Sequence, residues 1–190
     1  DGDLDLYVLS NALETFNRNT TRPKQTTGLG NSTDKLYRNN GDGTFTDVSE
    51  EAGILIEGYG LGLAISDIDK DGWPDIYIAN DFVTNDLLYI NNGNGTFTNS
   101  IARQMKHQSH NGMGTDIADF NNDGFMDVVV LDMLPEDNHR QKLLKGPDQY
   151  DAYHLLLDSG YYRQHMRNML HLNRGIDGEG NVAPLGLRKE

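Results

Sequence analysis

The sequence predicts an all-β fold, a partial β-propeller of about three four-stranded blades with a small helical insertion. Two recurring motifs support this prediction: an acidic loop that leads into an apolar strand, and a hairpin with an Asn/Asp/Gly turn. Both recur at one interval, because Asp75 and Asp127, like Leu36 and Leu88, are 52 positions apart. A repeat of about fifty residues that holds four short strands has the size of a propeller blade.

The hairpin motif reads LYRNNGDGTF over residues 36–45 and LYINNGNGTF over residues 88–97. Strand-forming residues on either side of an Asn/Asp/Gly turn are the strongest short-range signal for a hairpin. Residues 168–175, NMLHLNRG, resemble the hairpin a third time but lack the Gly-Thr-Phe ending. We therefore expect one hairpin in each unit.

The unit from residue 61 to residue 100 contains four predicted strands, near 61–66, 75–79, 86–91 and 96–99, which tight Gly-rich turns connect. The second strand of each unit is apolar at consecutive positions, as in VVVL over residues 128–131. Such a strand is buried on both faces, which predicts sheets stacked face to face.

We predict one partial propeller domain over residues 1–190. Its parts are a first blade, 1–50, with a polar surface loop, 10–34; a second blade, 58–100; and a third blade, 112–190, with a helical insertion, 136–167. In the insertion, leucines and tyrosines recur at partly helical spacing on either side of Gly146-Pro147, which predicts one or two short helices. The chain lacks an initiator Met and begins inside a motif, so we interpret it as a fragment without its signal peptide.

Charge and composition narrow the partners. The sequence has 16 Lys and Arg against 29 Asp and Glu, a formal charge of −13, which repels phosphate backbones and anionic lipids and attracts cations. We expect no nucleic-acid partner. The absence of cysteine excludes disulfides and thiolate metal ligands. No apolar run approaches the roughly 20 residues that span a bilayer, so we expect no membrane span in this chain.

The acidic loops carry alternate oxygen-bearing side chains, the ligands that hard divalent cations prefer. The predicted calcium ligands in the first complete loop are Asp67, Asp69, Asp71, the Trp73 carbonyl and Asp75. Those in the second are Asp119, Asn121, Asp123, the Phe125 carbonyl and Asp127, and those in a truncated copy are Asp1, the Asp3 carbonyl and Asp5. Gly72 at the sixth loop position permits the sharp turn.

Calcium is favoured over magnesium because every ligand comes from a flexible stretch of protein. The amide of Asn121 replaces a carboxylate, so we expect the second loop to bind more weakly, and the truncated copy to bind poorly. An EF-hand requires an acidic twelfth position and a following helix, but that position holds Ile78 or Val130 within an apolar strand. Asp and Asn also form simple turns, an alternative that the repeated copies disfavour.

The loops Asp67-x-Asp-x-Asp-Gly-x-x-Asp75 and Asp119-x-Asn-x-Asp-Gly-x-x-Asp127 resemble FG-GAP or VCBS repeats, the calcium loops of integrin-α-type propellers. The NNGxGTF hairpins and the run DMLPEDN over residues 132–138 resemble, more narrowly, the ASPIC/UnbV group, which is cartilage acidic protein-like. This resemblance implies a seven-bladed propeller, of which the chain holds about three blades, with an extracellular, cell-surface or periplasmic location.

The predicted function is a non-catalytic calcium-binding module that is a scaffold for a protein or glycan ligand. The alternative is the propeller part of a secreted carbohydrate-active enzyme, such as a polysaccharide lyase. That alternative requires a set of side chains in and beside the insertion to converge in a cleft: Tyr153, His154, Tyr161, Arg163 and His165. His107 and His110 have a spacing that zinc sites use, but no third ligand is evident and the surrounding sequence indicates a polar loop.

Overall fold

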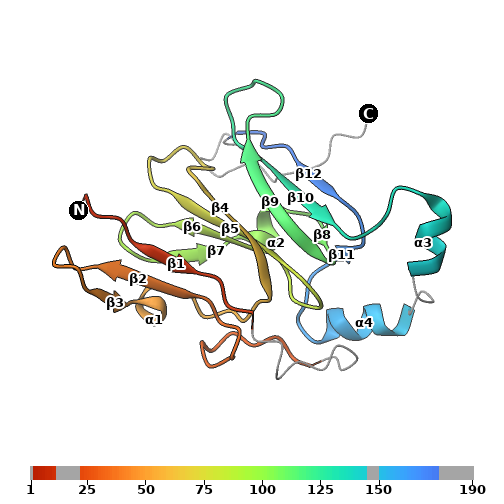
Figure 1. Cartoon of the computed structure of the whole chain (residues 1–190), viewed down its shortest axis with the longest axis horizontal. Helices are drawn as coiled ribbons and strands as arrows, with labels where there is room; N and C mark the ends of the chain where they lie inside the picture. The colour runs from red at the N-terminus through yellow and green to blue at the C-terminus, as the bar shows by residue number, and fades with distance from the viewer. Residues whose placement is uncertain (1, 12–21, 145–149, 176–190) are drawn as a thin grey trace.

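The computed structural model describes residues 2–11, 22–144 and 150–175. Three antiparallel sheets, each formed by consecutive parts of the chain, follow one another through the molecule, and two helices lie to one side of them (Figure 1). The architecture is mostly β with short helices. Outside the described residues lie 1, 12–21, 145–149 and 176–190. These include Asp1 and parts of the predicted surface loop 10–34, of the insertion 136–167 and of the C-terminal end of the third blade.

The second sheet is a complete four-stranded meander. It consists of β4 (Gly60–Ser66), β5 (Asp75–Asn80), β6 (Leu87–Asn91) and β7 (Phe97–Asn99), in that order. The four strands expected between residues 61 and 100 are therefore confirmed. The acidic loop connects β4 to β5, and the Asn/Gly turn connects β6 to β7, so each motif has a fixed place in the sheet.

The other two sheets contain corresponding strands. The first sheet is formed by β1 (Leu6–Val8), β2 (Lys35–Asn39) and β3 (Phe45–Asp47), and the third by β9 (Gly112–Ala118), β10 (Asp127–Asp132) and β12 (Met169–His171). Register shows the correspondence, because Ile76 pairs with Tyr89, Leu6 with Tyr37 and Val128 with His171. Residues 169–171 thus take the hairpin position that the sequence predicted.

The remaining elements connect or cover the sheets. They are α1 (Ser49–Ala52), α2 (Ile101–Gln104), α3 (Asn138–Leu144), α4 (Tyr150–Asp158) and a parallel pair, β8 (Gln108–Ser109) with β11 (Gln164–His165). Helices α3 and α4 are the short helices expected within the insertion. The β8–β11 pair joins the chain before the third sheet to the chain that follows α4.

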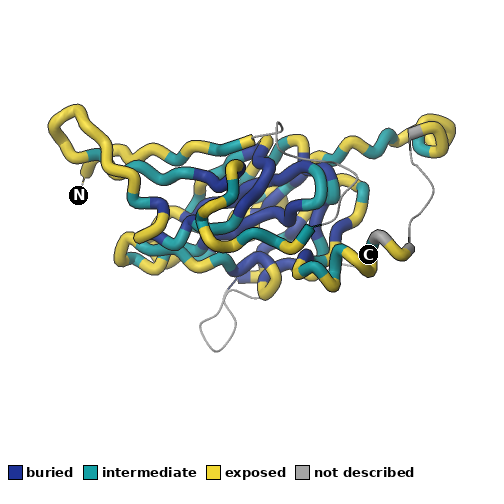
Figure 2. Tube along the Cα trace, turned by 90° about the horizontal axis from the view of Figure 1, so that it is seen from below, coloured by how far each residue is buried: buried dark blue, intermediate teal, exposed yellow. Residues whose placement is uncertain are grey.

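The core consists of two apolar layers, one on each face of the second sheet. Ile76 and Ile78 of β5 pack with Leu36 and Tyr7 of the first sheet, and Tyr77 packs with residues of the third. Buried residues concentrate in the middle of the stack in Figure 2. Every residue of β5 is buried, as the consecutive apolar residues 76–79 in its middle predict.

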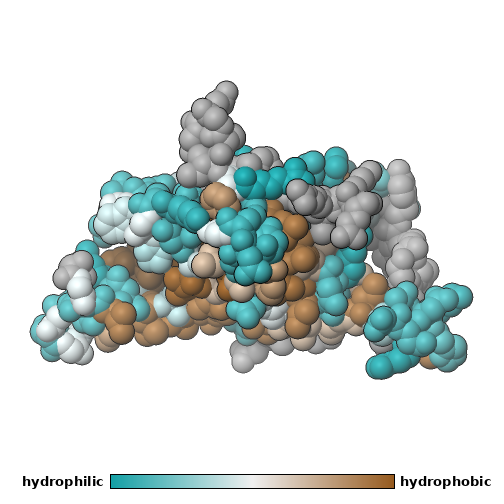
Figure 3. Space-filling view, turned by 90° about the horizontal axis from the view of Figure 1, so that it is seen from above, coloured by the Kyte–Doolittle hydropathy of each residue, from teal (hydrophilic) through white to brown (hydrophobic). Residues whose placement is uncertain are grey.

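Burial of β10 on both faces is only partly observed. Val128 and Val130 face the second sheet and are buried, whereas Leu131 is 55% exposed. Among the described residues no further sheet covers the face of β10 that carries Leu131, so an apolar sequence alone did not determine burial there. In Figure 3, apolar residues reach the surface along the body of the molecule, between hydrophilic ends.

The loop of residues 10–34 is less superficial than expected. Its last residues, Ser32, Thr33 and Asp34, are buried. The backbone N–H of Gly28 donates to Leu55, and that of Glu57 donates to Gln25. These bonds hold the described end of the loop against the chain that leads into β4.

Candidate metal centre in the acidic loops

The loop between β4 and β5 brings three carboxylates together. One oxygen each from Asp67, Asp69 and Asp71 lies within 4.8 Å of the others. Among the described residues, no other group of three acidic, His or Cys side chains has such spacing. Burial and the charges of Asp71 and Asp67 raise the pKa of Asp69. The loop therefore concentrates negative charge, which a bound cation relieves.

Backbone hydrogen bonds hold this loop in shape. The N–H groups of Asp71 and Gly72 donate to the two oxygens of Asp67 at 3.1 and 3.0 Å, and the N–H of Trp73 donates to Asp71 at 2.8 Å. Lys70 and Gly72 take positive φ angles of 62° and 93°. This backbone conformation explains why a glycine occupies position 72, since a residue with a side chain is strained at such a φ angle.

The loop between β9 and β10 repeats this geometry. Asp123 and Gly124 donate to the two oxygens of Asp119 at 3.0 and 2.8 Å, and Phe125 donates to Asp123 at 2.9 Å. One contact differs, because the Asn121 amide donates to Asp123 Oδ2 at 2.8 Å. The second loop therefore has less uncompensated charge than the first.

The ninth-position aspartates also bind the backbone of their own sheets. Both oxygens of buried Asp75 accept N–H groups, from Asn91 at 2.9 Å and from Ile68 at 2.9 Å. Burial raises the pKa of Asp75 to about 6, and these two bonds limit the rise. Asp127 accepts from Asn173 at 2.7 Å in the same way.

This aspartate–asparagine pairing was not predicted from the sequence. It recurs in the truncated copy, where Asp5 accepts from Asn39 at 2.9 Å. The available signal was an Asn three residues after a Leu in each hairpin motif: Asn39, Asn91 and Asn173, after Leu36, Leu88 and Leu170. Asp1 lies outside the described residues, and Asp3 and Asp5 are exposed beside the first sheet.

The residues at the seventh loop position place aromatic rings over hairpin glycines. A Cβ on Gly93 would lie 2.8 Å from Trp73 Nε1, and a Cβ on Gly175 would lie 2.7 Å from Phe125 Cζ. Lys70 Nζ of the first complete loop lies 4.1 Å from the Phe125 ring centroid. The two acidic loops are therefore neighbours, linked by a cation–π contact.

The first complete loop could hold a metal ion on these observations. Ion pairs join Arg22 to Glu57 and Lys35 to Asp47, and no loop carboxylate among the described residues forms one. Carboxylate oxygens converge on a tight turn in the first loop, and the second has the same backbone pattern. A carboxylate oxygen that accepts one N–H has a second lone pair available for a cation.

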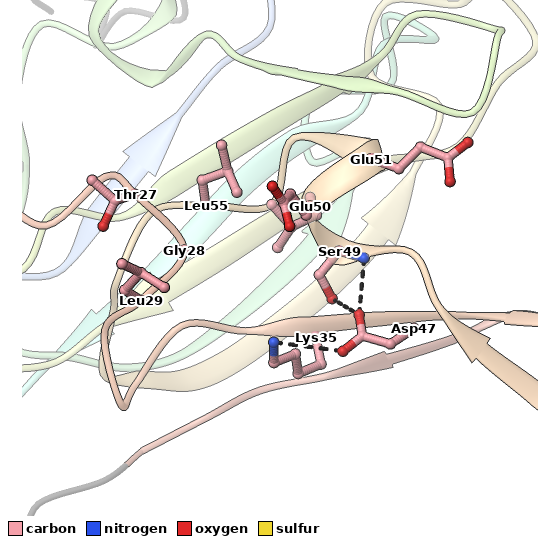
Figure 4. Close-up of a pocket in the computed structure, with 10 residues that line it drawn as sticks. Thr27, Gly28, Leu29, Lys35, Asp47, Ser49, Glu50, Glu51 and Leu55 are labelled. Carbon is pink, nitrogen blue, oxygen red and sulfur yellow. Dashed lines mark hydrogen bonds and ion pairs between the residues drawn. The ribbon is translucent and has the colours of Figure 1, made fainter.

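Two hollows lie near the first sheet. One, of about 820 Å³, lies beside α1 (Figure 4), where both the N–H and the hydroxyl of Ser49 donate to Asp47, which also contacts Lys35. The other, of about 680 Å³, lies between the first and second sheets and is lined by Trp73, Pro74 and Phe97. Trp73 is 51% exposed, so this second hollow adjoins an acidic loop and carries an accessible aromatic ring.

The side chains required by the enzyme alternative make separate contacts. The rings of Tyr153 and His154 touch each other on α4, at 5.6 Å between centroids, whereas His165 contacts His107 at 5.7 Å. Burial raises the pKa of Tyr161, and the nearby charge of Arg22 opposes this rise. His110, whose spacing from His107 is one that zinc sites use, has a ring nitrogen 3.0 Å from the Asn111 side-chain oxygen.

The fold and the loops define a repeat protein, in which antiparallel sheets alternate with acidic turns. The profile of the FG-GAP-like repeat matches residues 1–78 and 67–130, and the chain belongs to this family. It is also similar to cartilage acidic protein 1 of Mus musculus, 37% identical over 84 residues, and of Homo sapiens, 36% identical over 84 residues. Each match covers 44% of this chain and 13% of the relative.

The match thus spans about an eighth of the length of these curated relatives. None of the helices in the described ranges has the length and apolarity needed to cross a bilayer.

Proposed function

We propose that this chain is a non-catalytic calcium-binding module, in which each ion fixes the turn between the first two strands of a sheet. The proposed ligands in one loop are Asp67, Asp69, Asp71, the Trp73 carbonyl and Asp75. Those in the other are Asp119, Asn121, Asp123, the Phe125 carbonyl and Asp127, and Asp3 and Asp5, with Asp1, belong to the incomplete copy. The three sheets are proposed as blades of a propeller that further blades complete.

The observation that carries this proposal is the close group of Asp67, Asp69 and Asp71. Three carboxylates on one exposed turn repel one another, and the folded chain offers them backbone N–H groups but no basic side chain within the described residues. A divalent cation supplies the missing positive charge. Because it binds the folded turn and not the extended chain, it stabilises the fold by mass action.

The loops suit an environment rich in calcium, which supports an exported protein. Calcium loops on the exposed surface of modules outside the cell typically have dissociation constants of about 10⁻⁴–10⁻³ M. Such sites fill only where calcium is abundant. We therefore propose an extracellular, cell-surface or periplasmic location.

The hollow beside Trp73 supports a binding role for the scaffold. Trp73 and Pro74 belong to the acidic loop, so an ion that orders the loop also fixes this wall of the hollow. An exposed tryptophan ring next to polar side chains is typical of surfaces that bind proteins or sugars. We propose that a protein or glycan ligand binds here.

Trp73 makes the calcium test specific, because it is the only tryptophan of the chain. Chelator-stripped protein is titrated with calcium while tryptophan fluorescence and calorimetric heat are followed together. We expect two sites by calorimetry, and a fluorescence change that belongs to the first complete loop alone. Each site should also raise the melting temperature.

Variants assign the two sites. Asp71→Ala should remove the fluorescence change and one site, whereas Asp123→Ala should remove the other site and leave the fluorescence change. Asp116→Ala is the matched control, since it removes one exposed carboxylate from β9, outside the loop. Absence of heat and of any thermal shift would show that the loops are only turns.

A further inference from the structure

Three histidines from distant parts of the sequence meet beside the third sheet. The ring centroid of His107 lies 5.7 Å from that of His165 and 6.1 Å from that of His171. His107 precedes β8, His165 lies in β11 and His171 ends β12. The β8–β11 pairing brings the first two together, and the β10–β12 pairing positions the third.

His171 presents a polar atom that lacks a partner. Its side chain is 1% exposed, and its Nε2 has no hydrogen-bond partner among the described residues. A buried imidazole nitrogen without a partner is costly, so it points to a ligand. The corresponding residues of the other two sheets are Tyr37 and Tyr89, which makes the histidine a specific feature of the third.

The cluster is open on one side. His107 is half-buried and His165 is exposed, so an ion can reach the group from solvent. Burial lowers the pKa of all three rings, that of His171 to about 4, with a smaller effect from neighbouring cationic groups. The neutral imidazole is the form that binds metals.

The ring spacing is close to that of a metal site. Two histidines that bind one tetrahedral ion at about 2.0 Å have ring centroids roughly 5 Å apart. The observed spacings are longer, and the three ligand nitrogens do not all lie within 4.8 Å of one another. Rotation of the exposed His165 and half-buried His107 rings would close the group around an ion.

We propose that His107, His165 and His171 form a site for a divalent transition-metal ion of the zinc class. Imidazole nitrogen favours zinc, copper and nickel, whereas calcium prefers oxygen, so this site is chemically separate from the acidic loops. The bound ion would tie the segment after α4 and strand β12 to the segment before β8. Water would complete the coordination.

Arg167 is the natural competitor of the ion. Its guanidinium lies 3.3 Å from His107 Nε2, where it occupies the lone pair and adds positive charge. An ion that binds His107 through Nε2 must displace it. The site therefore has one side chain whose removal should strengthen binding, in contrast to the three whose removal should weaken it.

The test is a zinc titration of chelator-stripped protein by calorimetry, with calcium in excess so that the acidic loops are saturated. Cobalt, followed by its visible absorption, reports the coordination geometry. The variants are His107→Ala and His165→Ala, both at positions exposed enough to be replaced without emptying the core. His110→Ala is the matched control, because it lies in the same segment but bonds to Asn111.

We expect one equivalent of zinc, weakened at least about tenfold by His107→Ala and by His165→Ala, unchanged by His110→Ala and tightened by Arg167→Ala. Circular dichroism melts of each variant establish that it is folded, and His107→Gln and His165→Gln replace any variant that is not. Absence of saturable zinc binding, or binding that survives both cluster variants, would overturn the proposal. So would equal loss in His110→Ala. These outcomes do not depend on the calcium proposal.

Discussion

Asn91 binds both Asp75 and the residue before it, Pro74, across neighbouring strands. The carboxylate of Asp75 accepts the Asn91 N–H at 2.9 Å, while the Asn91 amide donates to the carbonyl of Pro74, the residue before Asp75, at 3.1 Å. Gly93 N–H then donates to the Asn91 side chain at 3.0 Å. The acidic loop and the hairpin turn are thus joined through one asparagine.

The asparagine series should show a graded loss of stability. Asn173→Ala uncovers the buried carbonyl of Ile68 and that of Met126, so we expect a loss of about 2–3 kcal/mol in the free energy of unfolding. Asn91→Ala should lose about 1–2 kcal/mol, and Asn39→Ala, whose bonds are exposed, less. Urea unfolding of the calcium-free protein measures the order, and equal losses would contradict it.

At the other end of the first strand of the hairpin motif in each sheet, a side chain accepts hydrogen bonds from the neighbouring strand. We call this arrangement the clamp. In the second sheet, Asp86 accepts the Tyr77 hydroxyl at 2.7 Å and the Asn80 N–H at 2.9 Å. In the first sheet, Asp34 accepts from Tyr7 and Ser10 in the same way. Each carboxylate is buried, so it relies on these donors instead of water.

The third sheet builds this clamp without charge. Asn168 accepts the Asp132 N–H at 2.8 Å, and Val129 takes the register position of Tyr77. The third sheet therefore lacks both the hydroxyl donor and the carboxylate. This joint absence indicates that the tyrosine hydroxyl is present to satisfy the buried carboxylate.

Stability should depend on pH through Asp86. Burial raises its pKa from 3.8 to about 7, although the Asn80 and Tyr77 bonds oppose the rise. Between these pH values the folded protein holds a proton that the unfolded chain has released. The stability that Asp86 contributes in this way is therefore complete below about pH 4 and is lost as pH rises through about 7. The expected slope approaches about 1.4 kcal/mol per pH unit.

Asp86→Asn isolates this effect, because Asn168 shows that an amide fits the position. As pH rises from 5 to 8, the free energy of unfolding of the variant should increase relative to that of the native protein. Urea unfolding in the presence of chelator measures both. Asp34, whose pKa burial raises to about 6, changes equally in both proteins and cancels. Parallel curves for the two proteins would contradict the assignment.

Asn121→Asp should have opposite effects with and without calcium. It adds a fourth carboxylate to the second loop but removes the Asn121 amide that donates to Asp123. We expect calcium affinity to rise by roughly tenfold and calcium-free stability to fall. Asn122→Asp is the control, since it adds the same charge at a left-handed position, φ 59°, that Asp tolerates. Equal effects of both variants would mean that only net charge matters.

Gly62 and Gly114 offer a second matched pair, because they occupy the same position in β4 and β9. A Cβ on Gly62 would lie 2.7 Å from the backbone N of Thr115, whereas a Cβ on Gly114 would meet nothing within 4 Å. Gly62→Ala should cost about 3 kcal/mol or more, because two backbones must separate. Gly114→Ala should be nearly neutral. Thermal melts of the two variants measure the difference.

The sequence predicted those features that local pattern determines. Hairpins with Asn/Gly turns and strands of fixed spacing were located correctly, because each depends on a few adjacent residues. The loop geometry around Asp67 and Asp119 followed for the same reason. The second role of Asp75 was missed, since its partner Asn91 comes from another strand.

Two features depended on tertiary contacts that the sequence does not show. Leu131 is as apolar as its neighbours in β10, and only the absence of a covering sheet within the described residues leaves it exposed. For His107 the sequence offered no third ligand beyond His110, whereas its ring neighbours are 58 and 64 positions away, at His165 and His171. Spacing along the chain cannot reveal such a group.

The second sheet is covered on both faces, so its amide hydrogens should exchange with solvent more slowly than those of the two sheets on either side. Amide hydrogens of β5 should exchange with solvent only on global unfolding, whereas those of β1, whose Leu6 is 48% exposed, should exchange through local fraying. Such a gradient is the behaviour of a one-dimensional array, in which each unit is stabilised by its neighbours. A unit added against β1 or β10 would therefore slow exchange there and move the fraying end outward.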